Sequence, residues 1–262
     1  MRIITFMSDF GIKDSYVAQM KAVASSMTDA RLIDITHEIK QHNIRQGAFI
    51  LQSSAPYFPP GTVHVAVVDP GVGTNRRGIV ITTHSQILIG PDNGLLLPTA
   101  KSLGDFIVYS IENPKLLLDS ISNTFHGRDV FTPIACRIVN GLPFEEIGPI
   151  ITDFVEMDFG KVEITDKSAN GKIMYTDHFG NIITNIDWSR LKQHLDFGKK
   201  IMVFIGKKQK QIQFVKSYNF VKKGGLLATI GSSNNLEISM NQGDAAKKLR
   251  VKADDDIKIL FS

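Results

Sequence analysis

Two aspartates of this sequence directly follow apolar segments that are typical of buried strands. Asp9 comes after IITFMS, and Asp69 comes after VHVAVV and is followed by Arg76 and Arg77 in the stretch DPGVGTNRR. In an open α/β sheet ligands bind beyond the carboxyl ends of the strands, so both carboxylates stand where chemistry is expected. His126, in SNTFHGRDVF, stands at the entrance of a predicted helix, without apolar periodicity around it.

Asp129 and four glycines lie near these candidates. Asp129 falls in the first turn of the same predicted helix, where an acidic residue either caps the helix or takes part in chemistry, and both interpretations stay open. The glycines at positions 71, 73, 90 and 94 permit sharp turns or a close approach of the backbone to a ligand. Their spacing matches neither a phosphate-binding loop nor a dinucleotide-binding motif.

The first part of the chain alternates between strand and helix patterns. Strands are predicted in RIITFM, RLIDIT, TVHVAVV, GIVITT, QILIG and FIVYSI, and helices in DSYVAQMKAVASSM, NIRQGAFILQSSA, GLLLPTAKSL and RDVFTPIACRIVNG. This alternation predicts an α/β domain with a mostly parallel sheet over residues 1–155.

The second part of the chain is rich in short alternating strands. They are predicted in GKIMYT, NIITNI, KIMVFIG, KQIQFV, GLLATIG, NLEISM and DIKILFS, with one helical stretch, GDAAKKL. We predict a smaller antiparallel β-sandwich or barrel over residues 165–262, with the boundary in IITDFVEMDFGKVEIT.

Composition restricts the class of protein. The 262 residues are 43% hydrophobic, enough for one large or two medium cores, and we find neither a signal peptide nor an apolar run of membrane-spanning length. We therefore expect a soluble, cytoplasmic protein. The single cysteine, Cys136, lies in an apolar run and is expected to pack in the core in a reducing compartment. The net charge of +4 is concentrated in the Lys-rich stretch from Gly198 to Gly225, which is more typical of a solvated face than of a nucleic-acid site.

Six motifs, in order along nearly the whole chain, resemble one known family. The motifs are FMSDFGIKDSYVAQMKA, VVDPGVGTNRR, GPDNGLL, TFHGRDVF, DHFGNIITNI and LEISMNQGDAAKKL. Together they resemble the S-adenosyl-L-methionine (SAM) hydroxide adenosyltransferases, or SAM hydrolases, which are relatives of the SAM-dependent fluorinase and chlorinase. The resemblance implies an α/β N-terminal domain, a β-rich C-terminal domain and a homotrimer with active sites between subunits.

The reaction implied by the resemblance is attack of water or hydroxide on the ribose C5′ of SAM, which gives adenosine and L-methionine. The family's catalytic Asp, Arg and His correspond here to Asp69, Arg76 and His126. Arg77 is then expected to face solvent or another subunit. The enzyme needs no general acid, since a thioether leaves without a proton; its tasks are to hold water in line, remove its proton and exclude bulk solvent. Which group accepts the proton stays open at this point.

The substrate-binding residues implied by the resemblance come from both halves of the chain. Asp9 is expected to accept both ribose hydroxyls, with capping of the following helix as the alternative. In the second half, Asp177 is expected to bind the methionine ammonium, Phe179 an apolar surface of the ligand, and Asn181 the adenine edge. Ser232 is expected near the methionine carboxylate. Glu237, in the adjacent LEI motif, completes the predicted set.

Three other functions are weighed against hydrolysis. A SAM-binding protein without turnover is disfavoured because the family's Asp, Arg and His set is complete. A SAM halogenase is disfavoured because related halogenases carry tyrosines at the positions of Asp69 and His126, and a carboxylate repels a halide. A nucleic-acid-binding module is disfavoured because the aromatic residues of the Lys-rich strands, Phe204, Phe214, Tyr218 and Phe220, are expected in the core. The scattered histidines and lone cysteine give no zinc spacing, so we expect no metal and no organic cofactor.

Overall fold

The chain divides into two compact units. The computed structural model describes residues 2–261, and the first unit ends at Met157 while the second begins at Asp158. The segment before this division belongs to the first unit because two of its residues are fixed there. The amide of Val155 donates to Asp92 over 2.8 Å, and Arg77 donates to Asp153 over 2.9 Å.

The first unit contains a six-stranded mixed sheet in the order β2-β1-β3-β5-β4-β6. The strands are β1 (Ile3–Ser8), β2 (Arg31–Thr36), β3 (Val63–Val67), β4 (Gly78–Thr83), β5 (Ile87–Pro91) and β6 (Phe106–Ser110). The predicted mostly parallel sheet is confirmed, since β2, β1, β3 and β5 run parallel. Only β4 runs antiparallel to its neighbours, because a tight turn joins it to β5 and a parallel connection needs a longer crossover.

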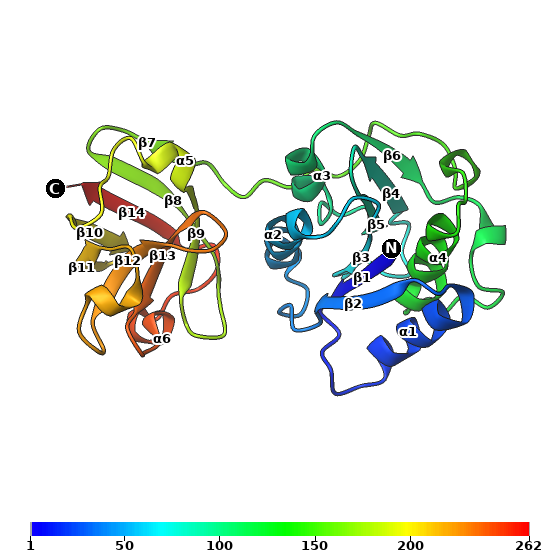
Figure 1. Ribbon diagram of the computed structural model, residues 1–262, viewed down its shortest axis with the longest axis horizontal. Coiled ribbons are helices and arrows are strands. Elements are labelled where there is room, and N and C mark those ends of the chain that lie inside the picture. The colour runs from blue at the N-terminus through cyan, green and yellow to red at the C-terminus, as the bar shows by residue number, and fades with distance from the viewer. Residues whose placement is uncertain (1, 262) are drawn as a thin grey trace. The chain divides into compact units, whose positions relative to one another are not determined.

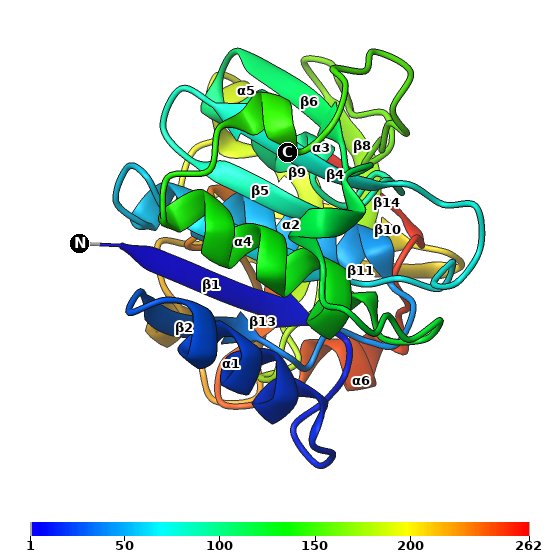
Figure 2. The ribbon, with the colours of Figure 1, turned by 90° about the vertical axis from the view of Figure 1, so that its right-hand side faces the viewer.

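Helices cover both faces of this sheet. They are α1 (Tyr16–Met27), α2 (Ile44–Ser54), α3 (Leu97–Leu103) and α4 (Thr132–Val139), with the short 3₁₀ helices η1 (Ala55–Tyr57), η2 (Pro114–Leu116) and η4 (Phe144–Glu146). In Figures 1 and 2, α1 and α4 lie on one face and α2 and α3 on the other. The apolar sides of α1 and α4 share a core with β1 and β3, and this core contains Cys136. Cys136 is fully buried, which confirms its packing role, and burial raises the pKa of its thiol to about 11.

The predicted helix after His126 begins with a π-helical turn, η3 (Gly127–Phe131), which leads into α4. Pro133 has no amide hydrogen and so cannot bond the carbonyl of Asp129, four residues earlier. That carbonyl instead accepts from Leu118 over 3.1 Å, while the hydroxyl of Thr132 donates to the carbonyl of Gly127 over 2.7 Å. π-helical turns are frequent at functional sites, and this one places His126 at its start.

The second unit is a mostly antiparallel barrel, as the alternating pattern predicted. Its strands are β7 (Glu163–Ile164), β8 (Ser168–Thr176), β9 (Ile182–Asp187), β10 (Lys200–Ile205), β11 (Lys208–Phe214), β12 (Leu226–Ile230), β13 (Asn235–Met240) and β14 (Asp256–Phe261). Pairing of β14 with β8 closes seven of them, and β7 adds to β8 outside the ring. The predicted helix is α6 (Ala245–Leu249); α5 (Trp188–Leu191) and the 3₁₀ helix η5 (Tyr218–Phe220) were not predicted.

The helices were also compared with the length and hydropathy of membrane-spanning segments. Within residues 2–261 no helix has both the length and the apolar character required to cross a bilayer.

Candidate active site

Asp69, Arg76 and His126 lie together beyond the carboxyl end of β3. Arg76 Nε donates to Asp69 Oδ1 over 3.1 Å, and its Nη2 donates both to Asp69 Oδ2 and, over 3.2 Å, to His126 Nδ1. The side chains of Arg76 and Asp69 are only 10% and 4% exposed. One arginine therefore joins the carboxylate and the imidazole, which come from segments 57 residues apart in the sequence.

Backbone contacts set the position of this arginine. The loop after β3 turns at Gly73, whose φ is +76°, and a Cβ there would lie 2.4 Å from the carbonyl oxygen of Asn123. Only glycine fits that approach, which brings the loop carrying Arg76 against the segment that leads to His126. Asn93, which was not predicted, donates to the carbonyl of Val68 over 2.8 Å and so holds the strand end directly before the carboxylate.

The state of His126 follows from its surroundings. A guanidinium only donates hydrogen bonds, so Nδ1 of His126 accepts from Arg76 and the neutral ring carries its proton on Nε2. Burial, followed by the charge of Arg76, lowers the pKa of His126, and Asp69 and Asp129 oppose this effect. The ring is therefore neutral at pH 7 and offers an N–H donor on its far side.

Aromatic rings lie near Arg76 and near the residue that follows His126. Phe10, Tyr16 and Phe125 form a cluster with ring centroids 5.3–5.9 Å apart. A Cβ on Gly127, the residue after His126, would come within 3.4 Å of Phe10. Arg76 lies over Phe131, 5.5 Å from the ring centroid. Apolar surface beside the Arg76 guanidinium strengthens its charge interactions relative to water.

Arg77, which the sequence placed toward solvent or another subunit, is 34% exposed and has partners in its own unit. Its Nη2 donates to Asp92 over 2.8 Å and to the carbonyl of Asp153 over 2.6 Å, and its Nη1 donates to the Asp153 carboxylate. These bonds raise the pKa of Arg77, with the Asp153 bond contributing most. Asp92 belongs to the GPDNGLL motif. The contact with Arg77 gives this residue of the motif a structural role.

Asp9 lies just beyond β1, the strand beside β3. Its Oδ2 accepts from the backbone amide of His42 over 2.8 Å. The alternative interpretation, capping of α1, is not what the structure shows, because Ser15 is the N-cap residue of that helix. Because β1 and β3 are parallel neighbours, Asp9 and Asp69 extend from the same edge of the sheet.

Asp129 has a structural role. Its buried carboxylate accepts from Arg128 Nε over 2.6 Å and from the amide of Ser122 over 2.7 Å. Arg128 also reaches Gln19 of α1 over 2.7 Å. The carboxylate thus holds the segment before His126 against the helix that follows it, which is a different task from helix capping.

In the second unit, Asp177 organises the turn between β8 and β9. Its Oδ1 accepts from the amides of Phe179 and Asn181, and its Oδ2 accepts from the side-chain amide of Asn181, all over 2.9 Å. Phe179 at the tip is 75% exposed. The structure thus brings these three predicted residues together in one hydrogen-bonded turn that presents an aromatic ring.

Ser232 lies apart from that turn. It is exposed in the turn between β12 and β13. The antiparallel register sets Ile182 opposite Ile238 and Asp187 opposite Asn235. The turns that precede β9 and β13 therefore lie at opposite ends of this ladder.

Glu237 is buried within the second unit, with 5% exposure. Its Oε1 accepts from the hydroxyls of Tyr218 over 2.9 Å and Ser239 over 2.6 Å. Burial, followed by the bond to Glu237, raises the pKa of Tyr218 to about 12. Glu237 thus anchors η5 to β13.

The aromatic residues of the Lys-rich segment do not all enter the core. Phe214 is fully buried, as expected, but Tyr218 and Phe220 are 41% and 66% exposed. The expectation was wrong for these two because they lie in η5, outside the alternating pattern of β11. It was also wrong for Phe204, which is only partly buried and lines a surface pocket, because it alternates in β10 with the buried Val203 and Ile205.

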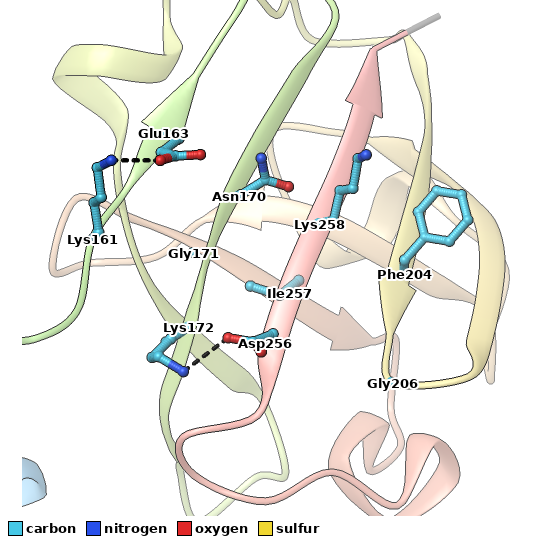
Figure 3. Close-up of a pocket in the computed structure, with 10 residues that line it drawn as sticks. All are labelled: Lys161, Glu163, Asn170, Gly171, Lys172, Phe204, Gly206, Asp256, Ile257 and Lys258. Atoms are coloured by element: carbon cyan, nitrogen blue, oxygen red, sulfur yellow. Dashed lines mark hydrogen bonds and ion pairs between the residues drawn. The ribbon is translucent and has the colours of Figure 1, made fainter.

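Figure 3 shows an open pocket of about 560 Å³ on the second unit, lined from β7, β8, β10 and β14. Two ion pairs occupy its wall, Lys161 with Glu163 at 2.6 Å and Lys172 with Asp256 at 2.8 Å. None of the predicted site residues lines it. Across the part of the chain that the structure describes, no cluster of His, Cys, Asp and Glu could hold a metal ion.

The fold and the polar cluster define a two-domain chain with an α/β sheet, a closed β-barrel and an Asp–Arg–His site at the edge of the sheet. Residues 4–148 match the model of the SAM hydroxide adenosyltransferase N-terminal domain, and residues 171–258 match that of its C-terminal domain. The chain belongs to this family.

Two named relatives match nearly the full length of this chain. The (R)-S-adenosyl-L-methionine hydrolase of Methanocaldococcus jannaschii is 38% identical, with 99% of this chain and 96% of the relative covered. The enzyme of the same name from Salinispora arenicola is 35% identical, with 98% and 97% covered. A fluorinase of Nocardia brasiliensis is more distant, at 28% identity with 77% of each chain covered.

A solved structure has the same architecture. The crystal structure of an uncharacterized conserved protein from Thermotoga maritima superposes with a TM-score of 0.93 at 38% identity, covering 98% of this chain and 99% of that one.

Proposed function

We propose that this protein hydrolyses S-adenosyl-L-methionine to adenosine and L-methionine. The observation that carries the proposal is the buried arginine that joins Asp69 to His126 beyond the end of β3. Full-length relatives named for this activity support it. Their names specify the (R) form of the substrate, and we propose the same preference here.

The reaction is a displacement at a carbon that carries a good leaving group. The water oxygen forms a bond to C5′ of the ribose while the C5′–S bond breaks. The electron pair of the broken bond stays on sulfur, which becomes the neutral thioether of methionine. Because sulfur loses its positive charge without taking a proton, no general acid is required. The protein has to hold the water in line and exclude competing solvent.

The contacts of Arg76 support different roles for His126 and Asp69 toward the attacking water. His126 Nδ1 is occupied by Arg76, so its Nε2–H donates to the water and orients it. Asp69 then accepts the proton. A carboxylate suffices, since the oxygen becomes strongly acidic as its bond to C5′ forms. Arg76 holds both partners and keeps the carboxylate in one orientation.

We propose that Asp9 binds the ribose hydroxyls, because a carboxylate can accept from two neighbouring donors. From the second unit, the turn of Asp177, Phe179 and Asn181 is proposed to contact the methionine and adenine ends. Ser232 and Glu237 are also proposed contacts; Ser232 lies at the other end of the β9–β13 ladder from this turn, and Glu237 already bonds Tyr218.

Halide transfer is the alternative that the fold itself allows. The buried Asp69 carboxylate disfavours it, because a negative charge beside the nucleophile's position repels a halide but accepts a proton from water. For nucleic-acid binding, the exposed Tyr218 and Phe220 supply two rings in one short helix, without the succession of stacking platforms that single strands use. We propose a cytoplasmic enzyme without metal or organic cofactor, since the reaction requires none.

We further propose that the active unit is a homotrimer whose sites combine residues of both halves of the chain from neighbouring subunits. An Asp69→Asn variant and an Asp177→Ala variant should each be inactive alone. Mixed trimers of differently tagged chains should regain part of the activity. Mixed trimers that form without regaining activity would refute shared sites and leave the chemistry intact.

The reaction is tested by incubating the purified protein with each sulfur epimer of SAM in ¹⁸O-labelled water, with and without chloride. We expect adenosine that carries the label at O5′, together with methionine, and unchanged rates with chloride. Unlabelled adenosine, or 5′-chloroadenosine as the main product, would contradict hydrolysis.

A further inference from the structure

The loop that carries Asp9 is tied to the loop after β2 by four hydrogen bonds. Two join backbone groups: the amide of Gly11 donates to His37 over 2.8 Å, and the amide of Ile39 donates to Ser8 over 3.4 Å. The third joins the amide of His42 to the Asp9 carboxylate. The fourth joins side chains, Ser8 Oγ and His37 Nδ1, over 2.7 Å.

The side-chain bond is buried and continues outward as a chain. Ser8 and His37 are 0% and 4% exposed. On the other side of the ring, His37 Nε2 lies 3.2 Å from Asp34 Oδ1, at ion-pair distance without hydrogen-bond alignment. Asp34 also accepts from Lys21 of α1 over 2.5 Å. The chain thus runs from the end of β1, through β2, to a helix at the surface.

The direction of these bonds can be assigned. The amide of Phe10 donates to Ser8 Oγ over 3.3 Å. Nε2 of His37 faces the Asp34 carboxylate, which accepts from a proton-bearing nitrogen, and with the ring proton assigned to Nε2 the serine hydroxyl donates to Nδ1. The hydroxyl therefore binds the amide after Asp9 on one side and the imidazole on the other, which fixes the backbone on both sides of the carboxylate.

A β-bulge aligns these residues. Phe6 pairs with Asp34, but the next residue, Met7, pairs with Thr36, so β2 holds one extra residue at this point. Bulges re-aim side chains and are frequent beside active sites. Here the bulge falls directly before His37, at the carboxyl end of both strands.

We propose that His37, acting through Ser8, is a positioning residue that holds Asp9 in the orientation required to bind the ribose diol. This inference rests on the proposed function, since it assumes that Asp9 binds the substrate's ribose. It goes beyond that function by assigning a role to the buried Ser8–His37–Asp34 chain, which does not contact the reacting atoms. The role concerns substrate affinity, and the water-handling cluster is left unchanged.

The same strand provides a matched control. Thr5 Oγ1 lies 2.7 Å from His64 Nδ1, and both side chains are fully buried. This hydroxyl–imidazole pair has the same length as the Ser8–His37 pair but lies three residues earlier in β1, away from Asp9. Loss of either pair should destabilise the first unit, and only loss of the Ser8–His37 pair should weaken ligand binding.

The experiment measures binding of two probes, adenosine and 2′,3′-dideoxyadenosine, which lacks the diol, together with kcat, KM and thermal unfolding. For His37→Ala and Ser8→Ala we expect adenosine binding weakened on the order of 10-fold, as for other residues that orient a ligand-binding side chain. KM should rise with kcat nearly unchanged, and dideoxyadenosine binding should not change. His37→Asn, which places an acceptor near the former Nδ1, should restore most of the affinity.

The controls separate positioning from folding. His64→Ala should lower the unfolding temperature without changing adenosine affinity. In an Asp9→Ala background, His37→Ala should weaken adenosine binding no further, because the carboxylate that it positions is gone. If neither His37→Ala nor Ser8→Ala, both folded, weakens adenosine binding, or if they act equally with and without Asp9, the inference is wrong while the proposed function stands. Failure of the unaltered protein to bind adenosine or to form it from SAM would overturn both.

Discussion

Replacing Arg76 by methionine tests whether the buried ion pair is both a stabilising and a catalytic element. Methionine keeps an unbranched chain against Phe131 but removes every donor to Asp69 and His126. Asp69 is 4% exposed, so its carboxylate is left buried without a cation. Removing one partner of such a pair costs about 3–5 kcal/mol. At about 2–4 °C per kcal/mol, the unfolding temperature of the first unit should fall by about 6–20 °C.

A second change separates stability from catalysis. In Asp69→Asn/Arg76→Met no buried charge remains unpaired, and we expect at least half of the lost stability to return. Activity should not return, because neither the proton acceptor nor the orientation of His126 is restored. Arg76→Lys is the intermediate case. It keeps the charge, but a single ammonium cannot reproduce the forked geometry that reaches Asp69 and His126 together.

The assay combines thermal unfolding, followed by near-ultraviolet circular dichroism, with release of adenosine from SAM. The reasoning is refuted if Arg76→Met unfolds at the temperature of the unaltered protein, or if the double variant is no more stable than the single one. Adenosine formation by the double variant at the original rate would refute the assigned catalytic roles.

Three further predictions follow from single sites. The pKa of His126 is lowered, so its neutral form should sustain kcat/KM to below pH 6.5, and activity should fall as the pH drops through this lowered pKa; His126→Gln should remove that acid limb from the pH–rate profile. Burial, opposed by a weaker hydrogen bond, lowers the pKa of His64 to about 4. The free energy of unfolding should therefore be highest above pH 6.5 and fall by about 3 kcal/mol between pH 6.5 and 4, because the unfolded chain takes up this proton first. Denaturant titrations of His64→Asn should not show that loss. Gly73→Ala places a Cβ 2.4 Å from the Asn123 carbonyl and should lower kcat on the order of 100-fold, whereas Gly104→Ala, at φ +107° with open space around it, should leave kcat unchanged.

Sequence reasoning identified the elements because their patterns are local. Periodicity and turn residues predicted the α/β and β-rich halves, and the predicted strands are present in both sheets. Pairing is not local. β4 inserts antiparallel between β5 and β6, and β14 closes the barrel on β8. Both pairings depend on contacts between distant segments, which the residue pattern of one strand does not encode.

The candidate site shows the same division. Residue type and position after an apolar strand were enough to select Asp9 and Asp69, because the end of a parallel strand is a place that the sequence marks. His126 was selected by its position at the entrance of a predicted helix, without apolar periodicity around it. Which arginine turns inward was decided by packing: Gly73 lets the loop approach Asn123, and Arg76 then meets the carboxylate while Arg77 meets Asp92.

The Ser8–His37–Asp34 chain and the anchoring role of Glu237 could not be derived from sequence at all. A buried serine, histidine or glutamate has no periodic signal of its own, and its partner is set by a bulge in one case and by a short helix folding back on a strand in the other. The sequence by itself determined which chemical groups the chain carries to the ends of its strands. Only the tertiary structure decided which of those groups meet, because hydrogen bonds act over about 3 Å between segments that are distant in the chain.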